Sequence, residues 1–221
     1  MNNNIINFTA VRMRKVNMIV NTENKLKNNY YDIDKDTKLK IEEQVSRILK
    51  DKTDISSPYV DIIQLVKSDD FIVQTSAMDI NTTGCLIVND IDTVMDTNKH
   101  RLIVVNQHFK NDNNDENVEL KKSRFITAHE YGHFKLHKIP GQPIYAHRDT
   151  YHRTDIAELE ADYFARSILM PYRVFNIYAK AAKEISNGDR SNTIYLLSTI
   201  FKVTKDKTKK RLNDLEELQG E

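Results

Sequence analysis

The sequence contains very little cysteine, which limits how the chain can be cross-linked. Cys85 is the only cysteine among 221 residues, so an internal disulfide framework is excluded and a reducing compartment is compatible with the composition. Cys85 is interpreted as a small buried apolar residue and not as a reactive thiol, because free cysteines usually behave as small apolar side chains. Cross-linking therefore contributes nothing to this fold.

Long hydrophobic runs are also missing. No stretch approaches the ~20 apolar residues that a membrane-spanning helix needs. The N-terminal residues MNNNIINFTA lack a charged region followed by an apolar core, so we expect no signal peptide. These absences predict a cytoplasmic protein without membrane association.

An excess of charge of one sign is absent too. The chain has 33 Lys and Arg against 32 Asp and Glu, a net charge of +1, so no global field draws it to nucleic acid or membrane. The hydrophobic share of 39% and charged share of 29% are typical of soluble globular proteins. The length suits one domain with an appendage, or two small domains.

The first half of the chain mixes helical and strand patterns. Residues 1–37 are rich in Asn, Lys and Asp and predict a poorly specified extension. Apolar spacing predicts a helix over about 38–50, and Ser57 is expected to cap the next one. Three β-rich runs follow with no long helix between them, which predicts a short, mostly antiparallel sheet or meander. These runs cover residues 71–78, 84–90 and 100–109.

The second half reads as mainly helical, so the fold class is predicted to be α+β. Ser123 is expected to cap a helix, and residues 138–154 are interpreted as a long loop because they hold most of the remaining Pro and Gly. The next helix ends at Pro171, and a further one is stopped by Gly188. Two or three short helices are expected over 191–218.

The stretch RFITAHEYGHFKLH at 124–137 carries the clearest chemical signal. At about 100° per residue, His133 lies about 40° and Glu130 about 100° from His129, so all three share one helix face. Two neutral imidazoles one turn apart can hold one metal ion, with the glutamate beside its open position, as in HExxH zinc hydrolases. The apolar first turn around Phe125 argues against incidental surface histidines.

A third protein ligand is needed to complete such a site. His137 lies two turns, roughly 12 Å, beyond His129, and no glycine turns the chain back, so we interpret it as a residue behind the ligands or at the helix end. Glu158 is the better candidate, and Asp162, on the same face, could accept a hydrogen bond from a ligand imidazole. A capping-box role for Glu158 is the structural alternative. Glu160 is expected to point outward. Two small residues on the inner face, Ala161 and Ala165, are expected to let this helix pack closely on the first one. The outer side is expected to carry Tyr163, Arg166 and Ser167.

These motifs resemble the ImmA/IrrE family of small gluzincin-like metallo-endopeptidases. The resemblance implies a short sheet with an HExxH helix, one Zn²⁺ per chain, and cleavage of a cytoplasmic regulatory protein, typically a helix-turn-helix transcriptional repressor. Two departures, the order of Ile126 and Thr127 and an acidic insert before the HExxH helix, touch no ligand. The matching positions are Arg124, Phe125, His129, Glu130, His133, Glu158, Asp162, Leu169, Met170 and Pro171.

The expected chemistry is peptide hydrolysis with Glu130 as the catalytic general base. The tetrahedral oxyanion needs a donor besides the metal, and the sequence does not choose among its candidates. They are Tyr145, His147, Tyr151 and His152.

The C-terminal segment, IYLLSTIFKVTKDKTKKRLNDL, has a helix-turn-helix-like pattern. It is either a DNA reader or a small helical subdomain with a solvated lysine face, and lysines without aromatic or amide partners favour the second because they supply phosphate contacts, not base readout. The alternative function, a DNA-binding regulator with a vestigial peptidase site, is disfavoured by the intact Glu130. The predicted division is an extension over 1–37, a peptidase domain over 38–187 and an appendage over 188–221. The sequence leaves the oligomeric state open.

Overall fold

The computed structural model describes residues 32–50, 57–79, 81–89, 100–107, 116–139, 144–149 and 156–220. Ile33–Glu221 make up one compact unit. Within the described residues the fold is α+β, as predicted, with a small mixed sheet and seven helices. The expected extension lies almost entirely outside these residues, and the three-part division of the chain stays a prediction.

The sheet has four strands in the order β1-β3-β2-β4. Two of its three pairings are antiparallel, as predicted, but β1 runs parallel to β3, so the meander interpretation is wrong. The reason lies in Asn106, whose buried side chain accepts from the Met78 backbone and donates to the carbonyls of Asp79 and Thr82, which fixes the crossover after β1. The strands are β1 (Ile72–Ser76), β2 (Thr82–Asn89), β3 (His100–Asn106) and β4 (Ile144–Asp149).

Strand β4 corrects a second expectation, because it lies inside the segment interpreted as a loop. Its residues IYAHRD have neither a long apolar run nor a clear alternation, so the sequence carried no strand signal. The strand forms through pairing with the distant β2, from Thr82↔Asp149 to Val88↔Ile144.

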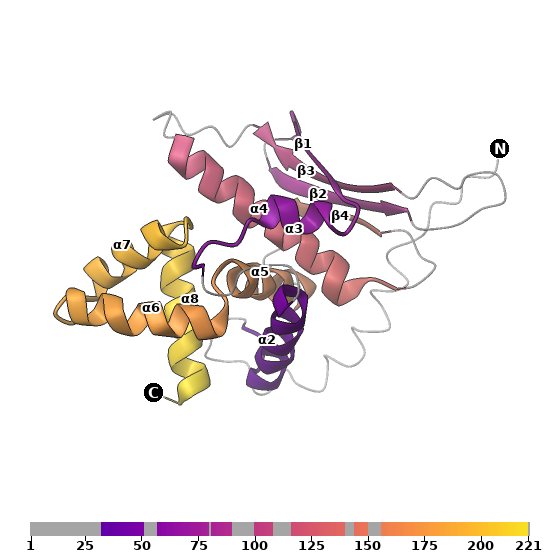
Figure 1. Cartoon of the computed structure of the whole chain (residues 1–221). Helices are drawn as coiled ribbons and strands as arrows, with labels where there is room; N and C mark the ends of the chain where they lie inside the picture. The colour runs from indigo at the N-terminus through magenta and orange to yellow at the C-terminus, as the bar shows by residue number, and fades with distance from the viewer. Residues whose placement is uncertain are drawn as a thin grey trace, which may run out of the picture. The chain divides into compact units, whose positions relative to one another are not determined.

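Helix α4 (Glu116–His137) lies between the sheet and α5 (Ile156–Leu169) (Figure 1). Residues 124–134 of α4 are all buried, which is what a helix covered on both sides requires. Its expected start at Ser123 is wrong, because the helix begins at Glu116. The first turns are polar and half-exposed, with Leu120 at 51%, so they show no apolar period that would mark them as helix.

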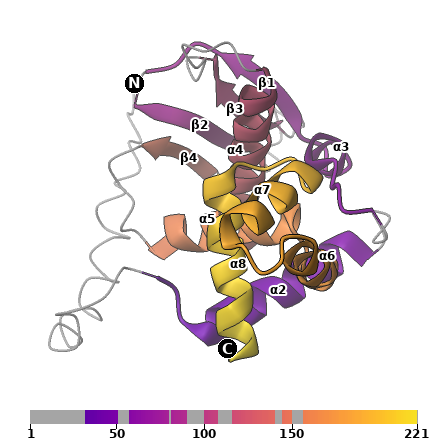
Figure 2. The ribbon, with the colours of Figure 1, turned by 90° about the vertical axis from the view of Figure 1, so that its left-hand side faces the viewer.

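The remaining helices are α2 (Lys35–Lys50), α3 (Ile62–Lys67), α6 (Tyr172–Ile185), α7 (Arg190–Ile200) and α8 (Lys205–Gln219). Of these, α2 and α8 pack on α5, α3 packs on α4 and β1, and α6 and α7 pack on each other and on α8. Helix α3 is capped by Asp61, which accepts a hydrogen bond from the Gln64 backbone at 3.0 Å, and not by Ser57 as predicted. Figure 2 shows α6, α7 and α8 together on the side that faces the viewer, with α8 crossing in front of α5. In the part of the chain that the structure describes, no helix has the length and apolar character needed to cross a membrane.

A buried ionic cluster joins α2, α5 and α8. The Arg211 guanidinium donates to the Glu42 carboxylate and to the Met170 carbonyl, while Tyr163 and Ser167 donate hydroxyl hydrogen bonds of 2.9 and 2.7 Å to Glu42. Burial alone would raise the pKa of Glu42, but the Arg211 charge and these hydrogen bonds hold the pKa below its usual range. We refer to these four side chains, Glu42, Tyr163, Ser167 and Arg211, as the Glu42–Arg211 cluster.

Candidate metal centre

Side chains from α4 and α5 converge at one point beneath the sheet. The Nε2 atoms of His129 and His133 lie 3.0 Å apart. One Glu158 oxygen is 3.2 Å from the first and the other is 3.1 Å from the second. Both histidines are buried, with His129 fully so. These three residues form a group that could hold a metal ion.

Small residues allow the two helices to approach closely enough for this. A Cβ atom added at Gly132 of α4 would lie 3.0 Å from a Phe164 ring carbon and 3.3 Å from the Ala161 backbone of α5. Because a larger side chain at either position would separate the helices, Gly132 and Ala161 set the reach of Glu158 toward the imidazoles. The sequence correctly indicated a small-residue contact on the α5 side.

Asp162 defines the orientation of the first imidazole. Its Oδ1 lies 3.0 Å from His129 Nδ1, and an ionised carboxylate can only accept hydrogen bonds. We therefore assign the proton of neutral His129 to Nδ1, which leaves the lone pair on Nε2 pointing into the centre.

A second chain of contacts orients the other imidazole. His133 Nδ1 is 3.2 Å from His137 Nδ1, and His137 Nε2 is 2.8 Å from Glu160. Since the carboxylate accepts, a neutral His137 donates from Nε2 and accepts at Nδ1, so His133 donates from Nδ1 and also presents its Nε2 lone pair to the centre. Sequence reasoning missed Glu160, which was expected to point outward.

The expected outer side of α5 is also corrected. Tyr163, Arg166 and Ser167 were assigned to it, but all three are buried, because α2 and α8 cover that side of the helix. An amphipathic pattern distinguishes two faces only where one of them meets solvent. The Glu42–Arg211 cluster, formed by residues distant in sequence, explains why polar side chains are tolerated there.

The donor set fits a metal cation. With the tautomers assigned above, two nitrogen lone pairs and a carboxylate face one another, an arrangement that only a cation or added protons can satisfy. Two nitrogens each about 2.0–2.1 Å from one zinc ion can be at most about 4.2 Å apart, and the 3.0 Å between His129 and His133 is within that limit. Burial raises the pKa of Glu158, whereas imidazoles protonated at Nε2, which would donate hydrogen bonds and carry positive charge, lower the pKa far below its usual range. A metal cation at the same point acts on the carboxylate in the same direction.

Glu130 lies beside this group, fully buried against strand β2. A Cβ atom added at Gly84 would lie 2.9 Å from Glu130 Oε1 and 2.5 Å from Ile126 Cγ2, so glycine makes room for the carboxylate. The charge of Glu130 also acts on Cys85. Burial raises the pKa of the Cys85 thiol, and the negative charge of Glu130 raises it further. Sequence reasoning did not select Gly84, although a glycine inside a strand pattern is a known sign of close approach.

The four candidate oxyanion donors have different positions. Tyr145 and His147 lie on β4, where they pair with Ile87 and Cys85 of β2, so β4 brings its backbone next to the strand that holds Gly84. Tyr151 and His152 lie outside the described residues.

One helix presents two inward-facing imidazoles and a buried glutamate, the next helix adds a carboxylate, and a small sheet lies above them. This arrangement defines a metallopeptidase-type domain with a small gluzincin-like fold. Residues 88–213 match the IrrE N-terminal-like domain of the M78 peptidases. The chain belongs to this family, which confirms the resemblance seen in the sequence. No curated protein matches the chain.

Proposed function

We propose that this protein is a zinc-dependent endopeptidase that hydrolyses a peptide bond in another protein. The observation that carries this proposal is the convergence of His129 Nε2, His133 Nε2 and Glu158, with the Glu130 carboxylate buried alongside. His129, His133 and Glu158 would hold one zinc ion, and Asp162 and His137 would keep the imidazoles in the tautomer that binds it.

The zinc ion, when bound, would supply a Lewis acid that activates water and polarises the scissile carbonyl. The role proposed for Glu130 is proton transfer: its carboxylate accepts a proton from the attacking water and delivers it to the leaving amine. Gly84 leaves the space that this carboxylate occupies. His129 and His133 take no proton in this scheme, because both Nδ1 positions are committed to hydrogen bonds.

The substrate class we propose is a cytoplasmic helix-turn-helix repressor, and family membership is its support. Co-expression with the product of a neighbouring regulator gene should give one discrete cut. The same co-expression with the Glu130→Gln variant is the matched control and should give none. Degradation of casein into many fragments by the purified protein would instead support a broad-specificity peptidase.

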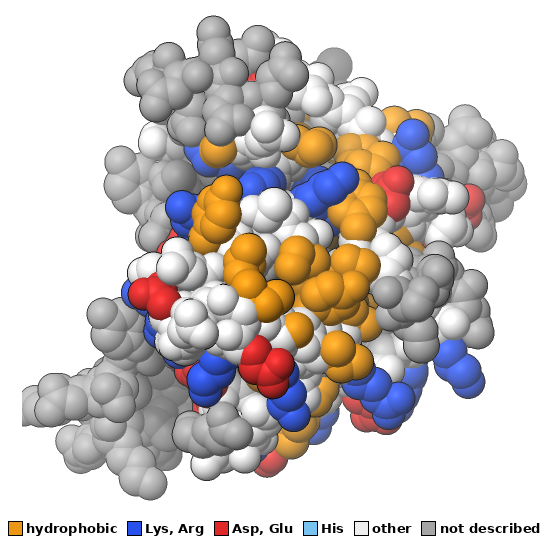
Figure 3. Space-filling model, turned by 60° about the vertical axis from the view of Figure 1, so that its left-hand side comes forward, with side chains coloured by type: hydrophobic (Ala, Val, Ile, Leu, Met, Phe, Trp, Pro, Cys, Tyr) orange, Lys and Arg blue, Asp and Glu red, His pale blue; other side chains and the backbone are white. Residues whose placement is uncertain are grey.

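The C-terminal helices are proposed to support the peptidase and not to read DNA. Of the basic side chains on α8, Arg211 is buried against Glu42 and Lys207 points to Asp162, so neither is available to a phosphate backbone. Lys205, Lys209 and Lys210 remain exposed. On the face shown in Figure 3, basic side chains lie in separate groups around hydrophobic ones, without a continuous stripe. A salt-resistant, sequence-specific shift of promoter DNA would contradict this and favour the regulator alternative.

A further inference from the structure

We infer that Lys207 of α8 is a positioning residue of the metal centre, acting through Asp162 on His129. This inference rests on the proposed function, because it assigns Lys207 to the support of a proposed metal ligand. It also makes the C-terminal helix a part of the site.

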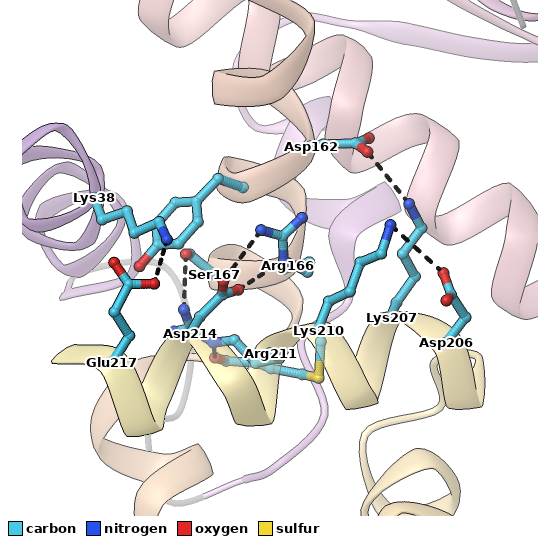
Figure 4. Close-up of polar contacts among 12 residues, drawn as sticks. Lys38, Asp162, Arg166, Ser167, Asp206, Lys207, Lys210, Arg211, Asp214 and Glu217 are labelled. Atoms are coloured by element: carbon cyan, nitrogen blue, oxygen red, sulfur yellow. Dashed lines mark hydrogen bonds and ion pairs between the residues drawn. The ribbon is translucent and has the colours of Figure 1, made fainter. Parts of the chain in front are cut away.

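The contact that carries the inference is a carboxylate shared between two helices. Asp162 Oδ1 lies 3.0 Å from His129 Nδ1, and its other oxygen, Oδ2, lies 3.4 Å from Lys207 Nζ (Figure 4). The Lys207 side chain is 16% exposed, so water screens the pair only weakly. With one oxygen held by an ammonium group, rotation of the carboxylate away from His129 breaks two contacts.

Lys207 is itself held in place by α4. Its Nζ lies 4.0 Å from the centre of the Phe125 ring, a favourable cation–π distance. The preceding residue, Arg124, is buried and donates to the carbonyls of Phe201 and Lys202 in the turn between α7 and α8, at 3.0 and 2.5 Å. Arg124 and Phe125 lie about one turn before His129 on α4. Arg124 thus fixes the turn that leads into α8, and Phe125 fixes the lysine that reaches Asp162.

The nearest competing cation on α5 is engaged elsewhere. The charge of Asp162 acts on Arg166, one turn along the helix, but the Arg166 guanidinium donates to Asp214 at 2.7 and 3.4 Å. Figure 4 shows Arg166 directed toward Asp214 while Lys207 reaches Asp162. Lys207 is therefore the ammonium group positioned to fix the carboxylate.

Lys207→Met tests the inference, because methionine keeps most of the side-chain length and removes the charge. We expect zinc affinity, measured by competition with a chromophoric chelator, to fall about tenfold, the lower end of the range for groups that support metal ligands. Lys207→Arg should restore most of the loss. The thermal midpoint of the metal-free protein should stay close to wild type, since this readout reports on fold alone.

Lys210→Met is the matched control on the same helix. Lys210 is half-exposed, with its Nζ 4.0 Å from Asp206, and the dashed line from its amine in Figure 4 runs to Asp206 and not to Asp162. Its substitution should leave zinc affinity unchanged.

A double-mutant cycle with Asp162→Asn separates positioning from a general effect of charge. If Lys207 acts through Asp162, adding Lys207→Met to the Asp162→Asn variant should lower zinc affinity almost no further. Equal zinc affinity of wild type and Lys207→Met, additive losses in the cycle, or a metal-free protein destabilised by Lys207→Met would each overturn the inference. Absence of zinc from the wild type would instead reject the proposed function itself.

Discussion

Helix α5 carries two buried polar clusters, and they differ in how their charges are balanced. On one side, the Glu42 carboxylate receives hydrogen bonds from Tyr163, Ser167 and Arg211, so the cluster contains its own cation. On the other side, His129, His133 and Glu158 face one another with lone pairs and carboxylate oxygens. The first cluster is complete as folded, and the second has the donor set of a cation site.

The difference shows how similar burial can serve stability or function. A buried charge is tolerated when a hydrogen-bonded counter-charge accompanies it, and the Glu42–Arg211 cluster meets that condition with residues of α2, α5 and α8. A group of converging acceptors does not, so it favours binding of an external cation. Substitutions should therefore affect stability in one cluster and metal binding or chemistry in the other.

Glu130→Gln should have the largest effect, and only on chemistry. Glutamine is nearly isosteric but cannot accept a proton, so cleavage of the physiological substrate should fall by about 10²–10⁴-fold, while zinc content and thermal midpoint stay close to wild type. Cleavage rates under substrate saturation provide the measurement. A variant that cuts at a near wild-type rate would show that Glu130 is not the base.

Arg211→Met should have the largest effect on stability. Removing the guanidinium leaves the Glu42 carboxylate buried without its counter-charge, which we expect to cost about 3–5 kcal/mol in the free energy of unfolding. Urea titration of the metal-free protein measures this. The exposed Lys209→Met should change stability by no more than about 0.5 kcal/mol. Similar, small losses for both variants would mean that the cluster does not stabilise the fold.

Glu158→Ala and Glu160→Ala should separate a ligand from a residue behind the ligands. Loss of Glu158 removes a proposed zinc contact, and affinity should fall by more than about 100-fold, beyond the range for supporting groups. Glu160 acts through His137 at 2.8 Å and is about three-quarters buried, so its loss should cost at most about tenfold. A zinc titration with the reverse ranking would show that the roles of these glutamates have been exchanged.

Acid should affect the two clusters one after the other as the pH falls. At moderate pH this acid effect is the smallest one that we expect. Zinc should leave first, because protons compete for the ligand imidazoles. The pKa of Glu42 is lowered from 4.5, so the folded state binds this proton less readily than the unfolded state. Its contribution to stability is therefore fully present above about pH 4.5 and is lost as the pH falls through the folded pKa.

Parallel measurements of zinc content and unfolding free energy from pH 7 to pH 3 test this order. Glu42→Gln should remove part of the stability loss below about pH 4.5 and leave the pH of zinc release unchanged. Loss of both properties at one pH in the wild type would contradict the separation of the two clusters.

The sequence predicted the parts of the site that depend on local spacing. His129, Glu130 and His133 share a face by helix geometry, and Glu158 and Asp162 do so on α5, as the structure has them. The acceptor role of Glu160 toward His137 was missed, because helix rotation places it away from Glu158 but says nothing about where a second helix ends.

Long-range contacts account for the errors in the fold. Strand β4 has no signal of its own and forms by pairing with β2, and the parallel placement of β1 depends on Asn106. The Glu42–Arg211 pair joins residues far apart in the chain, which no local period can indicate. Such features follow from packing between elements, whereas the predicted ones follow from packing within an element.

Elemental analysis of purified protein at neutral pH, without chelator, tests the central claim most directly. We expect one zinc ion per chain in wild type and in Glu130→Gln. His133→Ala should contain essentially none and should also be less stable, since metal binding contributes to folding. Wild-type protein without zinc, or a His133→Ala variant with the zinc content of wild type, would contradict the assignment of the converging side chains to a metal centre.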